Sequence, residues 1–164
     1  MLGVAVGELR RHEVGAQEEF DLRALPEDLS DLGLAGELQI RGRATNLGEE
    51  GVEVSLEIDG AIARECARCL APVSAPVHAA AEETFAVSGP WPSIAEGAVD
   101  LQPLVSEAVL LEEPLRVLCR PDCRGICPSC GKDLNEGPCG CEEHEVDPRL
   151  TPLSQLLHPR EENR

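Results

Sequence analysis

The sequence predicts an α+β fold: an antiparallel β-sheet covered by a helix, with a C-terminal cysteine-rich segment. Three observations predict it. Apolar and polar residues alternate through much of residues 34–87, helical spacing follows at 100–112, and five of the eight cysteines fall within 123–141. At 164 residues, the chain is long enough for one domain with a core and a small additional segment.

Residues 34–45 and 52–65 predict two antiparallel strands joined by a hairpin, because apolar and polar residues alternate with period two in both segments. The residues between them, NLGEEG at 46–51, are typical of a turn. One apolar face and one polar face are expected for a sheet that has one side in solvent.

The dipeptide Asp59-Gly60 has the composition of a second tight turn, but we predict a single strand over residues 52–65. A two-residue turn would place Glu57 opposite Ile62, whereas the even-numbered apolar positions continue to Ile62. Gly60 is then expected to form a bend or bulge in that strand.

A third alternating segment covers residues 73–87 and is interrupted at Glu83. Apolar residues at alternate positions within residues 2–6 predict a further short strand. Residues 88–97, SGPWPSIAEG, are rich in Pro, Gly and Ser and predict a connection to the next element.

Residues 100–112 predict a helix that covers the apolar face of the sheet. The apolar residues at helical spacing are Leu101, Leu104, Val105, Ala108 and Leu111. Asp100 is a suitable N-cap, Pro103 lies within the first turn, and Pro114 prevents continuation of the helix.

The eight cysteines form four closely spaced pairs, which is typical of tetrahedral zinc sites. The pairs are Cys66 and Cys69, Cys119 and Cys123, Cys127 and Cys130, and Cys139 and Cys141. Cysteines this close in sequence do not suit relaxed disulfides within a pair. The sequence therefore predicts a zinc-ribbon-like segment and one or two structural Zn²⁺ ions.

Spacing alone does not decide which pairs share a metal ion. We favour a local site formed by the last four cysteines, because only the turn-rich residues 131–138 separate its two pairs. The pair at 66 and 69 would then meet the pair at 119 and 123, after the predicted helix. The alternative combines the two Cys-x2-Cys motifs, 66/69 with 127/130.

These elements divide the chain into three predicted segments. Residues 1–33 form an N-terminal strand and loop segment, and residues 34–114 form the antiparallel sheet with its covering helix. Residues 115–164 form the cysteine-rich zinc segment and a short C-terminal helix, which Thr151 followed by Pro152 predicts.

The chain carries 14 basic and 31 acidic residues, a formal net charge of −17. Such a charge disfavours general binding to nucleic-acid phosphates and favours a basic protein partner. The sequence contains no secretory signal pattern and no apolar run of membrane-spanning length. We therefore expect the cytoplasm, where cysteines stay reduced, and no membrane association.

Six basic residues lie close to the cysteines in sequence: Arg64, Arg68, Arg116, Arg120, Arg124 and Lys132. Two interpretations remain open for them. They can neutralise the thiolates, partly through N–H···S contacts. Alternatively, they form a small basic patch that contacts RNA locally.

Catalytic zinc usually keeps one coordination position for water, whereas four cysteine ligands close the site. The four histidines are scattered singly, and no phosphate-binding glycine loop or nucleophile–base set stands out. We therefore predict that the protein is not an enzyme and has no small-molecule substrate. The alternative function is a zinc-dependent enzyme or a thiol redox protein.

Four motifs in order, CARCLAPV, DLQPLVSEAVLLEEPL, LCRPDCRGICPSCGKDLN and DPRLTPLSQLL, resemble the bacterial YceD family of large ribosomal RNA subunit accumulation proteins. The resemblance spans about Leu34 to Leu157. It implies a cytoplasmic, non-catalytic factor that supports 23S ribosomal RNA accumulation and large-subunit biogenesis. The family is often encoded beside a small ribosomal protein of the large subunit, which suggests a shared pathway.

Two mechanisms reconcile the acidic charge with this resemblance. The protein can hold a basic ribosomal protein until it assembles, which we favour, or it can contact ribosomal RNA through the arginine-bearing zinc segment. The sequence leaves open the direct partner, the oligomeric state and the number of filled zinc sites.

Overall fold

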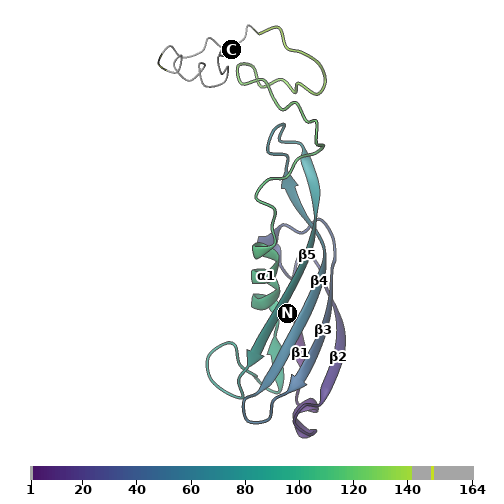
Figure 1. Cartoon of the computed structure of the whole chain (residues 1–164), viewed down its shortest axis with the longest axis vertical. Coiled ribbons are helices and arrows are strands. Elements are labelled where there is room, and N and C mark those ends of the chain that lie inside the picture. Colours follow the sequence, from purple (N-terminus) through teal and green to yellow (C-terminus); the bar gives the residue numbers. More distant parts are fainter. Residues whose placement is uncertain (1, 142–148, 150–164) are drawn as a thin grey trace, which may run out of the picture. The chain divides into compact units, whose positions relative to one another are not determined.

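The computed structural model describes residues 2–141 and residue 149 (Figure 1). It consists of two compact units, residues 1–123 and 124–164, which are described separately. In chain order, the elements of the first unit are β1 (Gly3–Ala5), η1 (Leu9–Arg11), β2 (Gln17–Ala24), η2 (Ser30–Leu32), β3 (Leu38–Asn46), β4 (Val52–Glu65), β5 (Pro72–Phe85), β6 (Ala98–Asp100) and α1 (Gln102–Leu111).

Strands β2, β3, β4 and β5 form one antiparallel sheet in that order, and β1 pairs with β6 in a second, two-stranded antiparallel sheet. The hairpin predicted between β3 and β4 is confirmed, with Asn46 opposite Val52. The prediction of one long strand through Gly60 is also confirmed, because β4 pairs with β5 without a break from Val52 to Glu65.

Gly60 serves close packing rather than a bulge. It pairs in register with Val77, so the ladder between β4 and β5 has no extra residue there. A Cβ atom on Gly60 would lie 2.3 Å from Leu38 Cδ2, and Leu38 is fully buried. The missing side chain therefore lets the first residue of β3 pack directly against β4.

Strand β2 is an edge strand that the sequence pattern did not predict. Its apolar set is short, because Phe20 and Leu22 are only partly buried and Glu18 occupies the same face. Phe20 covers Gly42 of β3, where a Cβ atom would lie 2.2 Å from the ring. The N-terminal segment thus contributes one strand to the main sheet.

Pro72 and Pro76 lie in β5, the edge strand on the opposite side. The N–H of Cys66 donates to the carbonyl of Ala71 at 2.8 Å, and hydrogen-bonded pairs alternate with non-hydrogen-bonded pairs in an antiparallel ladder. Residues 72 and 76 therefore occupy positions whose N–H groups would point away from β4. Neither proline removes a hydrogen bond from the sheet.

Helix α1 packs against β5 and covers one face of the sheet, as Figure 1 shows. Its buried residues are Leu104, Val105, Ala108 and Val109. The prediction that Leu111 also faces the core is wrong: Leu111 is the last residue of the helix and is 77% exposed. The N-cap is Leu101 and not the predicted Asp100, which is the last residue of β6. The Asp100 carboxylate still accepts a hydrogen bond from the Gln102 N–H at 3.0 Å, at the first residue of the helix.

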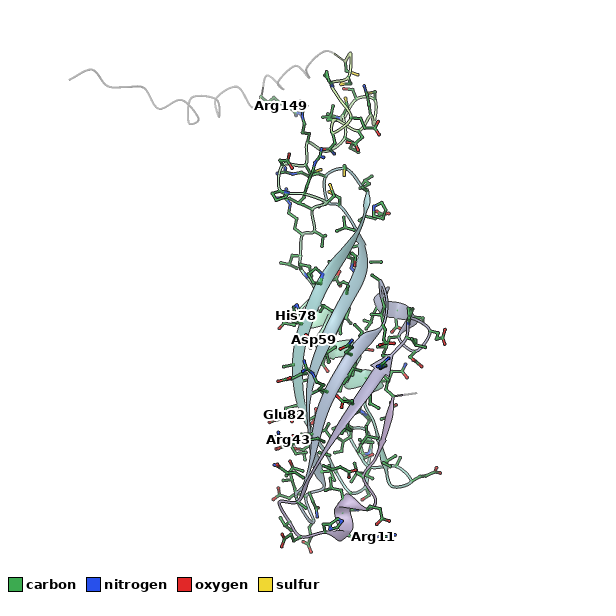
Figure 2. The ribbon with its side chains drawn as sticks, turned by 90° about the vertical axis from the view of Figure 1, so that its right-hand side faces the viewer. Arg11, Arg43, Asp59, His78, Glu82 and Arg149 are labelled. Atoms are coloured by element: carbon green, nitrogen blue, oxygen red, sulfur yellow. The ribbon has the colours of Figure 1, made fainter. Side chains whose placement is uncertain are left out.

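The core lies on the face of the sheet that α1 covers, and side chains from both sheets and the 3-10 helices contribute to it. The opposite face, hereafter the open face, is not covered by any element that the structure describes. Figure 2 labels Arg43, Asp59, His78 and Glu82 along the strands of this face.

Within residues 2–141 and 149, no helix is long and apolar enough to cross a membrane. The short helix predicted near Thr151 lies outside the described residues. The three-segment domain division stays a prediction.

Candidate metal centres

The eight cysteines gather into two groups of four. The first group is Cys66, Cys69, Cys119 and Cys123, and the second is Cys127, Cys130, Cys139 and Cys141. Within each group, all four Sγ atoms lie within 4.8 Å of one another. This is the grouping that we favoured, in which the last four cysteines form a local group across residues 131–138. The alternative, which joins the two Cys-x2-Cys motifs, is not observed.

Distances in the first group fit a tetrahedral metal ion better than a disulfide. Cys66 Sγ and Cys123 Sγ are 3.7 Å apart, and Cys69 Sγ and Cys119 Sγ are 3.5 Å apart. A disulfide requires about 2.05 Å. Zn–S bonds of about 2.3 Å give a tetrahedron with S···S edges of about 3.8 Å. The donors are therefore close to the arrangement that a four-thiolate ion needs.

Cys66 and Cys69 are presented by the turn between β4 and β5. The N–H of Leu70 donates to the carbonyl of Cys66 at 3.0 Å, and the Cys66 N–H donates to the carbonyl of Ala71 at 2.8 Å. Leu70 adopts a positive φ of 61°, which an L-residue seldom adopts. The strand pair thus ends in a tight turn that holds both thiols at its tip.

Two hydrogen bonds bring the segment after α1 to this turn. The Ala67 N–H donates to the carbonyl of Val117 at 2.8 Å, and Nη1 of Arg68 donates to the carbonyl of Cys123 at 2.6 Å. The first group therefore joins residues about fifty positions apart in the chain. A metal ion there would fasten the segment after α1 to the end of the sheet.

The second group lies entirely in the second unit and is built on a Cys127–Cys130 turn. The Gly131 N–H donates to the carbonyl of Cys127 at 2.9 Å, and the Cys127 N–H donates to the carbonyl of Lys132 at 2.8 Å. Gly131 has a φ of 73°, which glycine adopts without strain. Nζ of Lys132 donates to the carbonyl of Pro138 at 3.0 Å, next to the second cysteine pair.

The first thiol of the first group is disposed to ionise. The pKa of Cys66 is lowered to about 6, mainly because the N–H groups of Cys69 and Cys119 donate to its sulfur. The thiolate is the form that binds metal. The pKa of Cys119 is instead raised to about 12, first by its hydrogen bond with Cys69 and then by burial. A divalent cation would favour ionisation of all the thiols in such a group.

The second group repeats this pattern. The pKa of Cys127 is lowered to about 6, mainly because the N–H groups of Cys130 and Ser129 donate to its sulfur. The pKa of Cys141 is raised to about 12, first by its hydrogen bond with Cys130. Both Cys-x2-Cys motifs therefore use the backbone of the turn to stabilise one thiolate, as expected for metal-binding turns.

The structure places Arg64 in a partly buried position, in contact with several partners. Its Nη2 donates to Glu113 Oε2 at 2.7 Å, and its Nε donates to Glu113 Oε1. Its Nη1 donates to the carbonyl of Leu32 at 3.0 Å and to that of Ala63 at 2.7 Å. The side chain is only 25% exposed. These contacts favour a structural interpretation of Arg64 over RNA contact.

The other five basic residues near the cysteines, Arg68 among them, are exposed, so both interpretations remain open for them. Arg120 Nε lies 3.6 Å from Asp122 Oδ1. The backbone N–H of Arg124 donates to Asn135 Oδ1 at 2.8 Å, which leaves its side chain outside that contact. For Arg68, Arg116, Arg120, Arg124 and Lys132, an RNA contact stays a prediction.

Replacing Arg64 with alanine should lower the free energy of unfolding by about 1.5–3 kcal/mol, because a partly buried carboxylate loses its charged hydrogen-bond donors. The pKa of Glu113 lies below its ordinary 4.5 because of the Arg64 hydrogen bonds. This contribution should therefore be present above about pH 4.5 and lost as the pH falls through the lowered pKa.

Urea denaturation of the full chain measures this effect, and Arg116→Ala is the matched control at an exposed position. The control should change stability by less than about 0.5 kcal/mol. An equal decrease in the free energy of unfolding for the two variants would contradict a structural role for Arg64.

An antiparallel sheet covered by one helix, with two four-cysteine groups, defines a small α+β protein with candidate structural metal centres. Residues 54–157 match the family model of the large ribosomal RNA subunit accumulation protein YceD. The chain belongs to the YceD family, which confirms the resemblance carried by its motifs. No solved structure matches the chain.

Relatives come from bacteria and from a plant. An uncharacterized protein of Mycobacterium tuberculosis is 34% identical over 139 residues, which are 79% of this chain and 65% of the relative. The uncharacterized protein YlbN of Bacillus subtilis is 27% identical over 154 residues, 89% of each chain. The chloroplastic large ribosomal RNA subunit accumulation protein YCED homolog 1 of Arabidopsis thaliana is 33% identical over 58 residues, which are 35% of this chain and 18% of the relative. The chain thus spans 65% of the length of the Mycobacterium tuberculosis relative.

Proposed function

We propose that this chain is a non-catalytic factor that supports 23S ribosomal RNA accumulation and large-subunit biogenesis by holding a basic ribosomal protein until it assembles. The proposal rests on family membership together with one observation, a formal net charge of −17 on a protein with one sheet face that no described element covers. Such a surface attracts cationic protein segments and repels RNA phosphates.

The cysteine groups support a structural role for metal within this function. Four sulfur donors within 4.8 Å of one another suit one tetrahedral ion, and thiolates select soft or borderline metals such as Zn²⁺. We propose one or two structural Zn²⁺ ions. Four protein ligands leave no open position for a substrate, so the geometry favours bracing over zinc-dependent or thiol redox catalysis.

Direct contact with ribosomal RNA is the second candidate, and five exposed basic residues near the cysteines favour it: Arg68, Arg116, Arg120, Arg124 and Lys132. Such a contact would be local, because the rest of the chain is strongly acidic. Its affinity would fall with salt as the few neutralised phosphates regain their counterions.

Two measurements test the proposed function. Depletion of the protein should lower the ratio of 23S to 16S ribosomal RNA, and an unchanged ratio would remove the proposal. A tagged full-length chain should retain a basic large-subunit protein after nuclease treatment of the lysate. Loss of that protein on nuclease treatment would instead support the RNA contact.

A further inference from the structure

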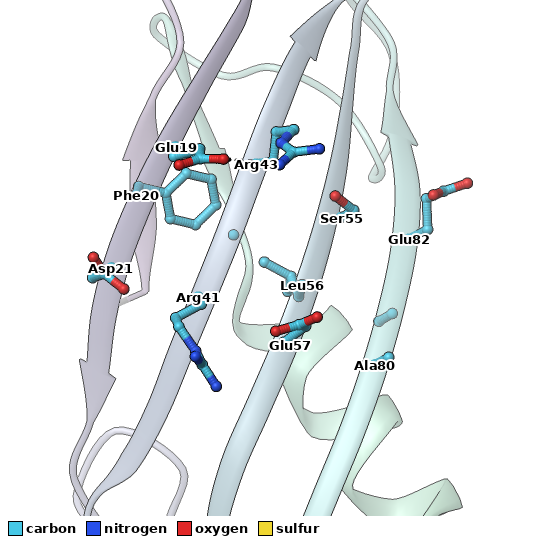
Figure 3. Close-up of a pocket in the computed structure, with 12 residues that line it drawn as sticks. Glu19, Phe20, Asp21, Arg41, Arg43, Ser55, Leu56, Glu57, Ala80 and Glu82 are labelled. Carbon is cyan, nitrogen blue, oxygen red and sulfur yellow. Dashed lines mark hydrogen bonds and ion pairs between the residues drawn. The ribbon is translucent and has the colours of Figure 1, made fainter.

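The open face of the main sheet contains a hollow, shown in Figure 3. Its volume is about 740 Å³, and side chains of β2, β3, β4 and β5 line it. Ser55 of β4 and Ala80 of β5 are small residues of this lining on adjacent strands. Larger charged side chains surround them, so the hollow has a shallow floor and a polar rim.

The charges around the hollow are unevenly compensated. Its lining carries four carboxylates and two guanidinium groups. Arg43 Nη2 is 2.8 Å from Glu19 Oε1, and Arg41 Nη2 is 2.8 Å from Asp59 Oδ2. Both arginines are thus already paired.

The three other carboxylates of the lining are Asp21, Glu57 and Glu82. None of them forms an ion pair with any residue that the structure describes. Asp21 and Glu57 lie opposite Arg41 on the neighbouring strands and share its charge with Asp59. The lining still has two more acidic than basic groups, which an incoming cation can neutralise.

Strand register sets the spacing of two of these carboxylates. Glu57 is opposite Ala80, and Ser55 is opposite Glu82, so Glu57 and Glu82 are diagonal neighbours on adjacent strands. Side chains in such positions start about 7–8 Å apart. An ammonium or guanidinium group above Ser55 and Ala80 can reach both carboxylates, because neither small residue blocks it.

We infer that this hollow is the docking site for an extended, lysine- and arginine-rich protein segment. This inference rests on the proposed function and assigns the surface that receives the basic partner. One basic side chain enters between Glu57 and Glu82. Further basic side chains of the segment contact Asp21 of the edge strand β2. The affinity comes from several exposed ion pairs, so it decreases as the salt concentration rises.

Binding of a fluorescent decalysine peptide to the full chain at low salt tests the site. The variant E57Q/E82Q should weaken binding about five- to tenfold, because two exposed ion pairs are lost. The matched control is E49Q/E50Q, which removes the same charge from the exposed turn between β3 and β4. The control should change the affinity by less than about twofold, since it acts only through net charge.

Equal weakening by both double variants would overturn the inference, because net charge alone would then explain binding. Tighter binding of a ten-nucleotide single-stranded RNA than of decalysine would overturn it in favour of nucleic acid. All substituted residues are exposed, so circular dichroism should confirm an unchanged fold.

Complementation separates this inference from the proposed function. If depletion lowers 23S ribosomal RNA and E57Q/E82Q restores it as fully as the unmodified chain, only the docking site is wrong. If depletion leaves 23S ribosomal RNA unchanged, the proposed function fails, whatever the peptide affinity.

Discussion

Metal removal should abolish hydrogen-exchange protection in residues 124–141, while the central strands β3 and β4 keep theirs. Among the described residues of the second unit, Cys127 is the only buried hydrophobic side chain, and none belongs to the hydrophobic core cluster. Apparent binding energies of structural zinc reach about 10–16 kcal/mol in small zinc peptides. A metal ion bound by the second group would therefore supply most of the stability of this segment.

The amides of Gly131 and Leu134 are the best reporters, because both donate to backbone carbonyls of the segment at 2.9 and 2.8 Å. The substitution Cys130→Ser should remove the hydrogen-exchange protection of these two amides, as chelation of the metal should. Glu136→Gln, an exposed change in the same segment, should leave them protected. Unchanged exchange at both amides after chelation would contradict a structural metal in the second group.

Replacing Gly51 with alanine should lower the free energy of unfolding by about 3–5 kcal/mol. Gly51 has a φ of 122°, a conformation that L-residues rarely adopt, and an added Cβ would lie 2.0 Å from the carbonyl oxygen of Phe85. Phe85 is fully buried at the end of β5, so its backbone cannot move without disturbing the core. Thermal unfolding should shift down by about 10 °C or more.

Gly36→Ala is the matched control for this prediction. Gly36 does not have a left-handed φ, and no atom lies within 4 Å of an added Cβ. Its replacement should change the free energy of unfolding by no more than about 0.5 kcal/mol. Thermal and urea unfolding of both variants check the difference, and similar stabilities would show that the β3–β4 turn tolerates a side chain.

Sequence periodicity predicted the elements whose faces differ strongly in polarity. Strand β4 has the predicted bounds, because buried apolar residues alternate from Val52 to Ile58 and again at Ile62, with only Gly60 between them. Strand β2 could not be recognised as easily, because an edge strand buries few side chains and Glu18 breaks the pattern. The three-residue strand β6 is too short for any period to emerge, and its pairing with β1 is a tertiary effect.

The candidate sites show the same division between local and tertiary information. Cysteine spacing identified the four pairs, and the short 131–138 connection favoured the observed grouping of the last two. The hollow on the open face depends on which residues of neighbouring strands lie side by side. Glu57 and Glu82 are far apart in sequence, and nothing local indicates that Ser55 and Ala80 lie between them.

The two prolines of β5 also affect how this protein meets other chains. A long, unpaired sheet edge is a template on which foreign strands add, which leads to aggregation. Pro72 and Pro76 remove outward donors from the half of that edge nearest the cysteine-bearing turn. Strand addition is therefore disfavoured at the end of β5 beside the first cysteine group, whereas residues 78–85 keep a full set of outward hydrogen-bonding groups.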